Sequence, residues 1–538
     1  MSGPVLSIEN LTVALPAWSD RPHAVEQVSL EIRANEILCV VGESGSGKSV
    51  MSKAILRLLP EPHVRVTEGR ILFDQQDILS LSEDQVRALR GGRISMIFQE
   101  PMTALNPLMP VGRQIDEILE VHSDMTPAAR RQRVVELFDD VRLPEPERLL
   151  TSYPHELSGG QRQRVMIAMA LALEPALIIA DEPTTALDVT TQAQILALMK
   201  DIQQRHGTSI LFITHDFGVV AEIADRVAVM RFGKLVEEGT AEEVLSRPQA
   251  DYTKDLIAAV PSLVPRDRES EEAQDQPVLV VRNLVKTYGG RGGLFGKVGR
   301  TVKAVADVSL AVENGQSVAV VGESGSGKST LARCIVGLEV PEAGDVMLKG
   351  ENIARLSRRA LQPYRKVVQM VFQDPFASLN PRRKVGDIIA LGPTIHGTSR
   401  EAAWDQAREL LGLVGLDPRA AERYPHEFSG GQRQRIGIAR ALAIKPQLII
   451  ADEPVSALDV SVQKQVLDLL DELRRTLSLS MLFITHDLRV AAHVCEQIVV
   501  MRNGELVEQG STAEIFSNPQ HDYTKALLDS VPGRDWRH

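Results

Sequence analysis

Two glycine-rich segments have the residue types and spacing that bind phosphate groups. Gly42-Glu43-Ser44-Gly45-Ser46-Gly47-Lys48-Ser49 recurs as Gly322-Glu323-Ser324-Gly325-Ser326-Gly327-Lys328-Ser329. The glycines let successive backbone N–H groups converge on phosphate oxygens, and the start of the following helix favours negative charge. We expect Lys48 and Lys328 to reach the β- and γ-phosphates of a nucleotide, and Ser49 and Ser329 to bind Mg²⁺. The predicted phosphate-binding residues are Gly42, Ser44, Gly45, Gly47, Lys48 and Ser49 in the first half, and Gly322, Ser324, Gly325, Gly327, Lys328 and Ser329 in the second.

A pair of adjacent carboxylates follows an apolar run in each half. Leu177-Ile178-Ile179-Ala180-Asp181-Glu182-Pro183 is matched by Leu448-Ile449-Ile450-Ala451-Asp452-Glu453-Pro454. Such runs predict strands buried on both faces, and neighbouring side chains of a strand point to opposite sides, so the two acids should have different tasks. Asp181 and Asp452 suit Mg²⁺ binding, and Glu182 and Glu453 suit activation of an attacking water as general bases. Strand-end turns with solvated acids are the alternative.

A third repeated motif predicts a second phosphate-binding helix start in each half. It is Leu157-Ser158-Gly159-Gly160-Gln161 in the first half and Phe428-Ser429-Gly430-Gly431-Gln432 in the second. Ser at the N-cap with Gln three residues later is a capping box, and the glycines leave backbone N–H groups bare. The glycine-rich loop of each half is already expected to hold one nucleotide. The second anion site of that half should therefore bind a different nucleotide. Taken alone, the motif is more simply a plain helix cap, and the other motifs favour the phosphate-binding role.

With these motifs the sequence resembles the ATP-binding-cassette (ABC) family over nearly its whole length and in both halves. The resemblance implies an α/β fold of two P-loop NTPase domains, each with a mainly parallel sheet core, a helical subdomain and an antiparallel β subdomain. It also implies that the two domains pair head to tail around two ATP molecules. One ATP would then face Ser429, Gly430, Gly431 and Gln432, and the other would face Ser158, Gly159, Gly160 and Gln161.

The resemblance assigns further residues to the sites. Gln99 and Gln373, in Phe-Gln-Glu-Pro and Phe-Gln-Asp-Pro, look like the glutamines that sense Mg²⁺ and the water and touch the transport partner. His215 and His486, in Ile-Thr-His-Asp, look like the histidines that contact the γ-phosphate. A lone histidine after an apolar strand is usually structural, but its place 34 residues beyond Asp181 favours the functional role. Ala186-Leu187-Asp188 and Ala457-Leu458-Asp459 resemble the loops through which the sites communicate.

The two halves differ where the family stacks an aromatic ring on adenine. Tyr288 fits that position in the second half, whereas the first half has Leu15. Stacking of a base on an aromatic face is worth about 1–3 kcal/mol. We therefore predict weaker nucleotide binding at the first site, unless Trp18 takes the place of the missing ring.

The repeat is that of two duplicated domains with short insertions and deletions. Lys48 recurs 280 residues later, and Asp181 recurs 271 residues later, which is far longer than a solenoid period. We expect domains at residues 1–261 and 278–538, a polar linker at 262–277 and a Gly-rich loop at 289–300. Strands are predicted at 37–41 and 210–214, and helices from Val50 and over 164–173.

Composition argues against several classes of function. The net charge is −11, so nucleic acid is a poor default partner. The three cysteines are far apart, which argues against zinc and disulfides and predicts three small buried residues. No run of about 18 apolar residues or export signal is apparent, so any membrane role should be played from the cytoplasmic side through partners.

Within the family, the chain is similar to the peptide and nickel importers, including oligopeptide, dipeptide, glutathione and microcin C systems. The similarity lies in Met102–Pro107, Phe376–Pro381, Asp251-Tyr252-Thr253-Lys254 and Asp522-Tyr523-Thr524-Lys525, although Asp stands in both tails where the group has Pro. It implies ATPase subunits fused in one chain at the cytoplasmic face of the bacterial inner membrane. The implied partners are two integral-membrane permeases and an extracytoplasmic solute-binding protein.

Three alternatives have distinct sequence signatures. A soluble tandem ABC ATPase of translation or DNA repair should carry a long charged linker helix, Cys pairs or a basic surface. A nucleotide-locked scaffold without turnover should lack Glu182 or Glu453, and both are present. An exporter usually carries its membrane helices in the same chain.

Overall fold

The computed structural model of the 538-residue chain describes residues 3–185, 187–266, 276–289, 301–456 and 458–536. Ala186 and Ala457, most of the predicted linker and most of the predicted Gly-rich loop lie outside the described residues. The contacts divide the chain between Val260 and Pro261 and again between Ser530 and Val531. The segment that begins at Val531 belongs to the first unit, where the Gly533 N–H donates to Glu222 Oε2 at 3.5 Å.

A six-stranded, mainly parallel sheet forms the centre of the first unit. Its order is β10-β9-β3-β8-β7-β6, and only β10 runs antiparallel to its neighbour. Every residue of β3, β7 and β8 is buried, as expected of apolar strands covered on both faces. The strands are β3 (Ile37–Val41), β6 (Ile94–Ile97), β7 (Leu177–Asp181), β8 (Ser209–Thr214), β9 (Arg226–Arg231) and β10 (Lys234–Thr240).

A second, antiparallel sheet of order β2-β1-β4-β5 covers one side of this core. Its apolar residues share one core cluster with β3 and with helix α1 (Lys48–Ile55), so the helix that follows the first glycine-rich loop is anchored by both sheets. The strands are β1 (Leu6–Ala14), β2 (His23–Ile32), β4 (Arg65–Phe73) and β5 (Gln76–Asp77), and α2 (Glu83–Leu89) follows them.

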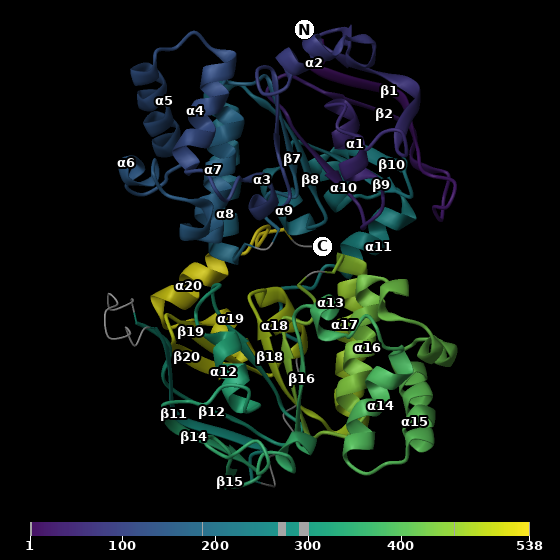
Figure 1. Cartoon of the computed structure of the whole chain (residues 1–538), viewed down its shortest axis with the longest axis vertical. Helices are drawn as coiled ribbons and strands as arrows, with labels where there is room; N and C mark the ends of the chain where they lie inside the picture. Colours follow the sequence, from purple (N-terminus) through teal and green to yellow (C-terminus); the bar gives the residue numbers. More distant parts are fainter. Residues whose placement is uncertain (1–2, 186, 267–275, 290–300, 457, 537–538) are drawn as a thin grey trace. The chain divides into compact units, whose positions relative to one another are not determined.

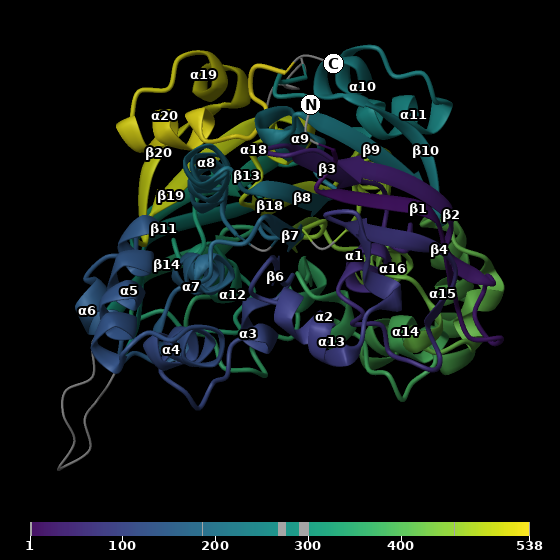
Figure 2. The same ribbon diagram turned by 90° about the horizontal axis from the view of Figure 1, so that it is seen from above.

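A group of helices lies at the other end of the first unit, away from β1 and β2 (Figures 1 and 2). It consists of α3 (Pro101–Ala104), α4 (Val111–His122), α5 (Pro127–Asp140), α6 (Pro146–Leu149) and α7 (Gly159–Leu171). The chain returns to the parallel sheet at β7, after which α8 (Val189–His206) follows β7, α9 (Phe217–Ile223) follows β8, and α10 (Ala241–Ser246) and α11 (Asp251–Ala259) follow β10.

The second unit repeats this plan. Its sheets have the orders β16-β17-β18-β13-β19-β20 and β12-β11-β14-β15, and α14, α15 and α16 form its helical group (Figure 1). The strands are β11 (Leu279–Tyr288), β12 (Val302–Val312), β13 (Ser317–Val321), β14 (Ala343–Leu348), β15 (Glu351–Asn352), β16 (Val368–Val371), β17 (Leu448–Asp452), β18 (Ser480–Thr485), β19 (Gln497–Arg502) and β20 (Glu505–Ser511). The helices are α12 (Lys328–Ile335), α13 (Pro375–Ser378), α14 (Val385–Ile395), α15 (Arg400–Leu413), α16 (Gly430–Leu442), α17 (Val460–Leu477), α18 (Leu488–Val494), α19 (Thr512–Ser517) and α20 (Asp522–Asp529).

The predicted fold class of two α/β P-loop domains is confirmed. The strand predicted at 37–41 is β3, and the one predicted at 210–214 lies within β8. Helix α1 begins at Lys48, two residues before the predicted start, and α7 begins at Gly159 rather than Arg164, because its first turn contains the capping motif itself.

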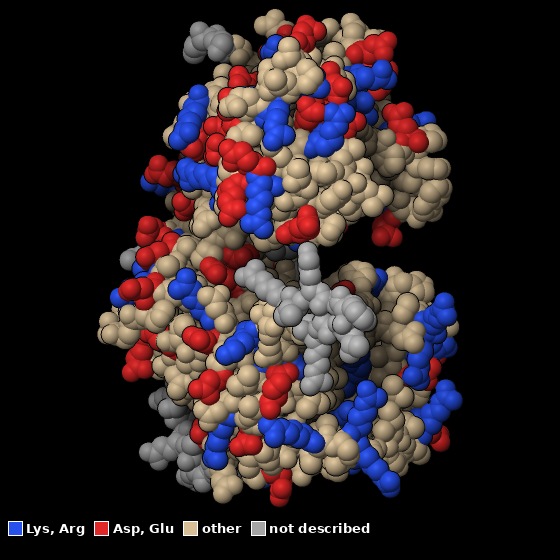
Figure 3. All heavy atoms as spheres, turned by 60° about the vertical axis from the view of Figure 1, so that its left-hand side comes forward, with Lys and Arg blue, Asp and Glu red and all other residues tan. Residues whose placement is uncertain are grey.

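The surface charges, the cysteines and the helix lengths add three observations. On the face in Figure 3 acidic and basic side chains are interspersed over both units. All three cysteines are buried, as predicted. Within the described ranges, no helix combines the length and apolar composition needed to cross a membrane.

Candidate nucleotide sites

The first glycine-rich loop connects β3 to α1 and requires glycine for steric reasons. Gly42 has a φ of 149°, and a Cβ there would lie 2.2 Å from the Met230 carbonyl oxygen. At Gly47, with a φ of 103°, a Cβ would lie 2.3 Å from the Ala24 oxygen. A side chain at either position would force the surrounding backbone apart, so the loop holds its N–H groups by close backbone packing.

Lys48 lies inside this loop. Its side chain is buried, and Nζ donates to the carbonyl oxygens of Gly42 at 2.6 Å and Glu43 at 2.9 Å. Lys328 makes the same contacts to Gly322 at 2.7 Å and Glu323 at 2.8 Å. Each ammonium group is therefore held among the N–H groups that the sequence predicts to bind phosphate.

Ser49 and Asp181 meet at the end of β7. Ser49 Oγ donates to Asp181 Oδ1 at 2.9 Å, and Ser329 Oγ donates to Asp452 Oδ1 at 3.1 Å. Burial raises the pKa of both aspartates above the usual range, against the hydrogen bonds from the serines, which lower it. Hydroxyl and carboxylate oxygens are ligands that Mg²⁺ prefers, so each pair fits an ion that takes further oxygens from nucleotide phosphates.

Glu182 departs from the predicted strand geometry. The strand ends at Asp181, and Glu182 has a left-handed φ of 48°, as Glu453 has a φ of 46°. The Glu182 N–H still donates to the Ile213 oxygen of β8 at 3.0 Å, but the chain turns away after it. The two acids therefore separate because of this turn, and the prediction that strand alternation separates them is wrong.

Three polar side chains converge on the Glu182 carboxylate. Gln99 Nε2 and Thr185 Oγ1 each donate to Oε2 at 3.0 Å, and His215 Nδ1 lies 3.4 Å from Oε1. Burial alone would raise the pKa of Glu182, but the hydrogen bond and charge of His215 outweigh it, and the pKa is lowered. The carboxylate is thus ionised at neutral pH. Sequence analysis missed Thr185, which stands in the turn three residues after Glu182.

The second unit repeats the cluster. Gln373 Nε2 donates to Glu453 Oε2 at 2.8 Å, and His486 Nδ1 lies 3.3 Å from Oε1. The pKa of Glu453 is lowered, because His486 outweighs the effect of burial. Burial by itself would lower the pKa of His486, but Glu453 raises it overall. Two independent copies of the sequence therefore fold into the same arrangement of base, amide and imidazole.

The predicted capping boxes are confirmed. Gln161 N–H donates to Ser158 Oγ at 3.3 Å, and Ser158 N–H donates to Gln161 Oε1 at 2.9 Å, at the start of α7. Ser429 and Gln432 make the same pair of bonds at the start of α16. Ser158, Gly159, Gly160 and Gln161 thus begin a helix of the helical group, whereas the P-loop cluster lies at the carboxyl ends of the parallel strands.

Tyr288 and Leu15, the residues predicted to differ in adenine stacking, lie at the ends of corresponding strands. Tyr288 ends β11 and is 39% exposed, with Lys286 Nζ 5.4 Å from its ring centre. Leu15 follows β1, and Trp18 is 77% exposed, with its ring 5.7 Å from that of His63. The loop that holds Trp18 reaches the P-loop through Arg21, whose guanidinium donates to the Gly45 oxygen. No repeat or motif marks Arg21 in the sequence.

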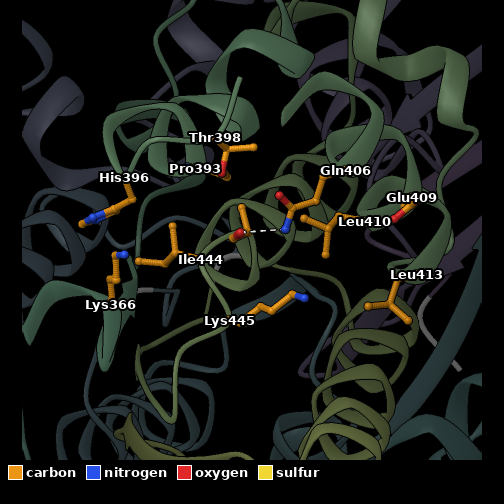
Figure 4. Close-up of a pocket in the computed structure, with 11 residues that line it drawn as sticks. Lys366, Pro393, His396, Thr398, Gln406, Glu409, Leu410, Leu413, Ile444 and Lys445 are labelled. Carbon is orange, nitrogen blue, oxygen red and sulfur yellow. Dashed lines mark hydrogen bonds between the residues drawn. The ribbon is translucent and has the colours of Figure 1, made fainter. Parts of the chain in front are cut away.

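A cavity of about 550 Å³ in the second unit lies among α14, α15 and the turn after α16 (Figure 4). Lys366, His396 and Lys445 line it, and Gln406 Nε2 donates to the Ala443 oxygen at 2.8 Å. In the first unit the ion pair of Arg133 with Glu174, at 2.8 Å, joins α5 to the turn after α7. This cavity contains none of the predicted site residues, and Gln406 and Lys445 line it where the first helical group has the Arg133–Glu174 ion pair.

Comparison with known proteins gives the same assignment for both halves. The "ABC transporter" family matches residues 25–185 and 305–456, and "Oligopeptide/dipeptide transporter, C-terminal region" matches 236–289 and 507–537. The chain is 51% identical to the "Peptidoglycan transport ATP-binding protein YejF" of Agrobacterium fabrum, over 98% of this chain and 96% of that protein. It is 46% identical to the "Glutathione import ATP-binding protein GsiA" of Salmonella typhimurium, over 99% of this chain and 90% of that protein. A solved ATP-binding cassette, in a post-hydrolysis dimer bound to ADP and phosphate, is 31% identical over 44% of this chain and 98% of its own, with a TM-score of 0.40.

Proposed function

The chain belongs to the ABC transporter family of ATPases, and from this membership we propose that it energises import of peptides or peptide-like solutes. The observation that carries the proposal is the identity of 51% and 46%, over nearly the whole chain, with proteins named for peptidoglycan transport and glutathione import. The two matches to an oligopeptide/dipeptide transporter region, one in each half, support the same solute class.

Each half has the groups that ATP hydrolysis needs. The P-loop N–H groups and Lys48 bind the phosphates, and Ser49 with Asp181 supplies oxygen ligands for Mg²⁺, which would neutralise phosphate charge. Glu182 accepts a proton from the attacking water, Gln99 orients that water and His215 donates to the γ-phosphate. In the second half Lys328, Ser329, Asp452, Glu453, Gln373 and His486 have the same roles. Because neither half lacks a group, both sites hydrolyse ATP.

ATP binding also drives the two halves together. We propose, from the family resemblance, that the glycine N–H groups at the capped starts of α7 and α16 bind the ATP held by the P-loop of the other half. Hydrolysis then removes the γ-phosphate that both halves hold, and they separate. Fusion in one chain raises the effective concentration of each half for its partner.

We propose that the permease contact lies on the segment around Gln99. Phe98, Met102 and Leu108 are 40%, 54% and 86% exposed, which is unusual for apolar side chains of this size so close together. A cavity of about 300 Å³ is lined by Ala104 of α3, by Asn106 in the loop after it, and by Val121 and other residues of α4. Closure of the halves would move this surface, because Gln99 joins it directly to Glu182. We assign it to two integral-membrane permeases at the cytoplasmic face of the inner membrane, which receive solute from an extracytoplasmic binding protein.

Uptake in a strain that lacks the gene tests the function. Labelled oligopeptides, glutathione and peptidoglycan fragments should each be offered to cells that carry the wild-type chain or the double variant Glu182→Gln/Glu453→Gln. We expect at least one solute to enter only with the wild-type chain. Wild-type uptake in the double variant for every solute, or purification of the chain with ribosomes rather than membrane subunits, contradicts the proposal and favours the soluble tandem ATPase.

A further inference from the structure

A tyrosine from the C-terminal part of the first unit reaches the P-loop. Tyr252, on α11, is only 8% exposed, and its hydroxyl group accepts the backbone N–H of Glu43 at 3.3 Å. The same hydroxyl donates to Glu43 Oε2 at 3.1 Å. Burial raises the pKa of Tyr252 to about 12, so the phenol keeps the proton that this second bond requires. Tyr252 therefore holds both the backbone and the side chain of one P-loop residue.

The second unit repeats this contact independently. Tyr523, on α20, is 6% exposed and accepts the backbone N–H of Glu323 at 3.1 Å. Tyr252 and Tyr523 stand in the two Asp-Tyr-Thr-Lys segments, and each lies within a match to the oligopeptide/dipeptide transporter C-terminal region. Two copies that have diverged elsewhere thus keep both a glutamate in the P-loop and a tyrosine aimed at it.

Each tyrosine is itself held in place from two sides. In the first unit the Glu237 carboxylate on β10 accepts the N–H groups of Gln249 and Ala250, at 2.7 and 3.1 Å, and so fixes the start of α11. The Arg231 guanidinium lies 4.5 Å from the centre of the Tyr252 ring. In the second unit Glu508 accepts Gln520 and His521 at 2.7 and 3.0 Å, and Arg502 lies 4.8 Å from the Tyr523 ring.

The bond between Tyr252 and Glu43 lies next to the backbone groups that are expected to bind phosphate. The Glu43 carbonyl oxygen accepts Lys48 Nζ, while the Glu43 N–H is held by Tyr252. The hydroxyl therefore fixes the peptide groups that lead from β3 into the loop, on which the directions of the following N–H groups depend. We infer that Tyr252 and Tyr523 are positioning residues that preset the two P-loops for ATP and connect the C-terminal region of each half to its nucleotide site.

The test measures ATP binding one site at a time. It rests on the proposed nucleotide sites, so the first site is studied in a Lys328→Ala background and the second in a Lys48→Ala background. Tyr252→Phe keeps the ring and its contact with Arg231 but removes both hydrogen bonds. We expect a fluorescent ATP analogue with Mg²⁺ to bind roughly five- to twentyfold more weakly, with KM for ATP raised more than kcat is lowered and the melting temperature nearly unchanged. Tyr523→Phe should do the same at the second site.

Two controls separate positioning from general destabilisation. Tyr364→Phe removes the hydroxyl of a half-buried tyrosine that packs on the core of the second unit, and it should leave ATP binding at the first site unchanged. Glu43→Gln keeps the backbone bond to Tyr252 but loses the carboxylate, so combining it with Tyr252→Phe measures how far the two groups act together. Wild-type KM in Tyr252→Phe, or a loss of activity that only follows a lower melting temperature, overturns the inference. If the parent chain binds no ATP, the proposed site fails instead.

Discussion

Replacing Glu182 and Glu453 by glutamine should abolish turnover while leaving the fold almost intact. In Glu182→Gln the oxygen that accepts from Gln99 and Thr185 at 3.0 Å is retained, and the new amide replaces the oxygen that lies 3.4 Å from His215. The interactions of the carboxylate charge with His215 and Lys48 are lost, and a partly buried charge is removed with them. We expect a stability change of no more than about 1.5 kcal/mol, or a few degrees in melting temperature.

The effect on the reaction should be much larger. Loss of a general base costs about 10²- to 10⁴-fold in rate, which corresponds to about 2.7–5.5 kcal/mol of activation free energy. The barrier change therefore exceeds the stability change, and the two can be separated in one set of samples. Phosphate release at saturating MgATP gives kcat, thermal unfolding gives stability, and retained nucleotide after gel filtration shows that ATP still binds.

The pH dependence sharpens this test. Because His215 holds the pKa of Glu182 below its usual value, Glu182 contributes stability above its unfolded pKa and loses that contribution as pH falls through the folded pKa. Turnover should thus show no titration of Glu182 between about pH 6 and 9. Glu174→Gln, which changes a glutamate that is 62% exposed and pairs with Arg133, is the matched control and should retain wild-type turnover. More than a tenth of wild-type turnover in the double variant would refute the assignment of the base.

Three further changes have definite expected outcomes. Asp181→Asn should raise the melting temperature of the nucleotide-free chain at pH 7 and abolish Mg²⁺-dependent hydrolysis. The melting temperature rises because burial raises the pKa of Asp181, so its charge costs stability above that folded pKa. A lower melting temperature would contradict this sign. Gly431→Ala should lower the free energy of unfolding by about 1–3 kcal/mol in denaturant titration, because the new Cβ would lie 2.2 Å from Val462 Cγ1. Gly430→Ala is the matched control and should cost far less, because its Cβ would lie 3.7 Å from Leu458 Cδ2. Equal losses in the two variants would contradict this reasoning. Leu15→Tyr should tighten ATP binding at the first site by roughly tenfold in a Lys328→Ala background, and unchanged affinity would indicate that Trp18 already serves as the stacking ring.

The parts of the site that sequence predicted well are those set by local physics. The all-apolar strands at 37–41 and 210–214 are recognisable because burial on both faces leaves no polar position. The capping boxes of α7 and α16 are recognisable because both partners lie within three residues. The identities of the P-loop glycines follow from phosphate geometry, and the close contacts at Gly42 and Gly47 give a second reason for them.

The parts that sequence did not predict depend on tertiary contacts. Glu182 has a positive φ although its N–H still pairs with Ile213 on the neighbouring strand, and no local sequence pattern predicts such a conformation at a glutamate. Arg21 reaches Gly45 from a hairpin loop whose sequence has no motif. Tyr252 lies 209 residues from Glu43, and its repeated Asp-Tyr-Thr-Lys segment signals that it matters without indicating what it contacts.

The differences between the halves lie outside the reacting groups. The clusters around Glu182 and Glu453 have nearly the same distances, whereas Leu15 replaces Tyr288, and the Arg133–Glu174 ion pair is replaced by Gln406 and Lys445. The groups predicted to act in hydrolysis are thus present in both halves, whereas the residue predicted to stack on adenine and the helical group differ. If Tyr288 stacks on adenine and Leu15 does not, we predict that the second site fills before the first at limiting ATP. A fused chain suits such unlike halves, because each remains joined to its complementary partner and cannot pair with a second copy of itself within the same molecule.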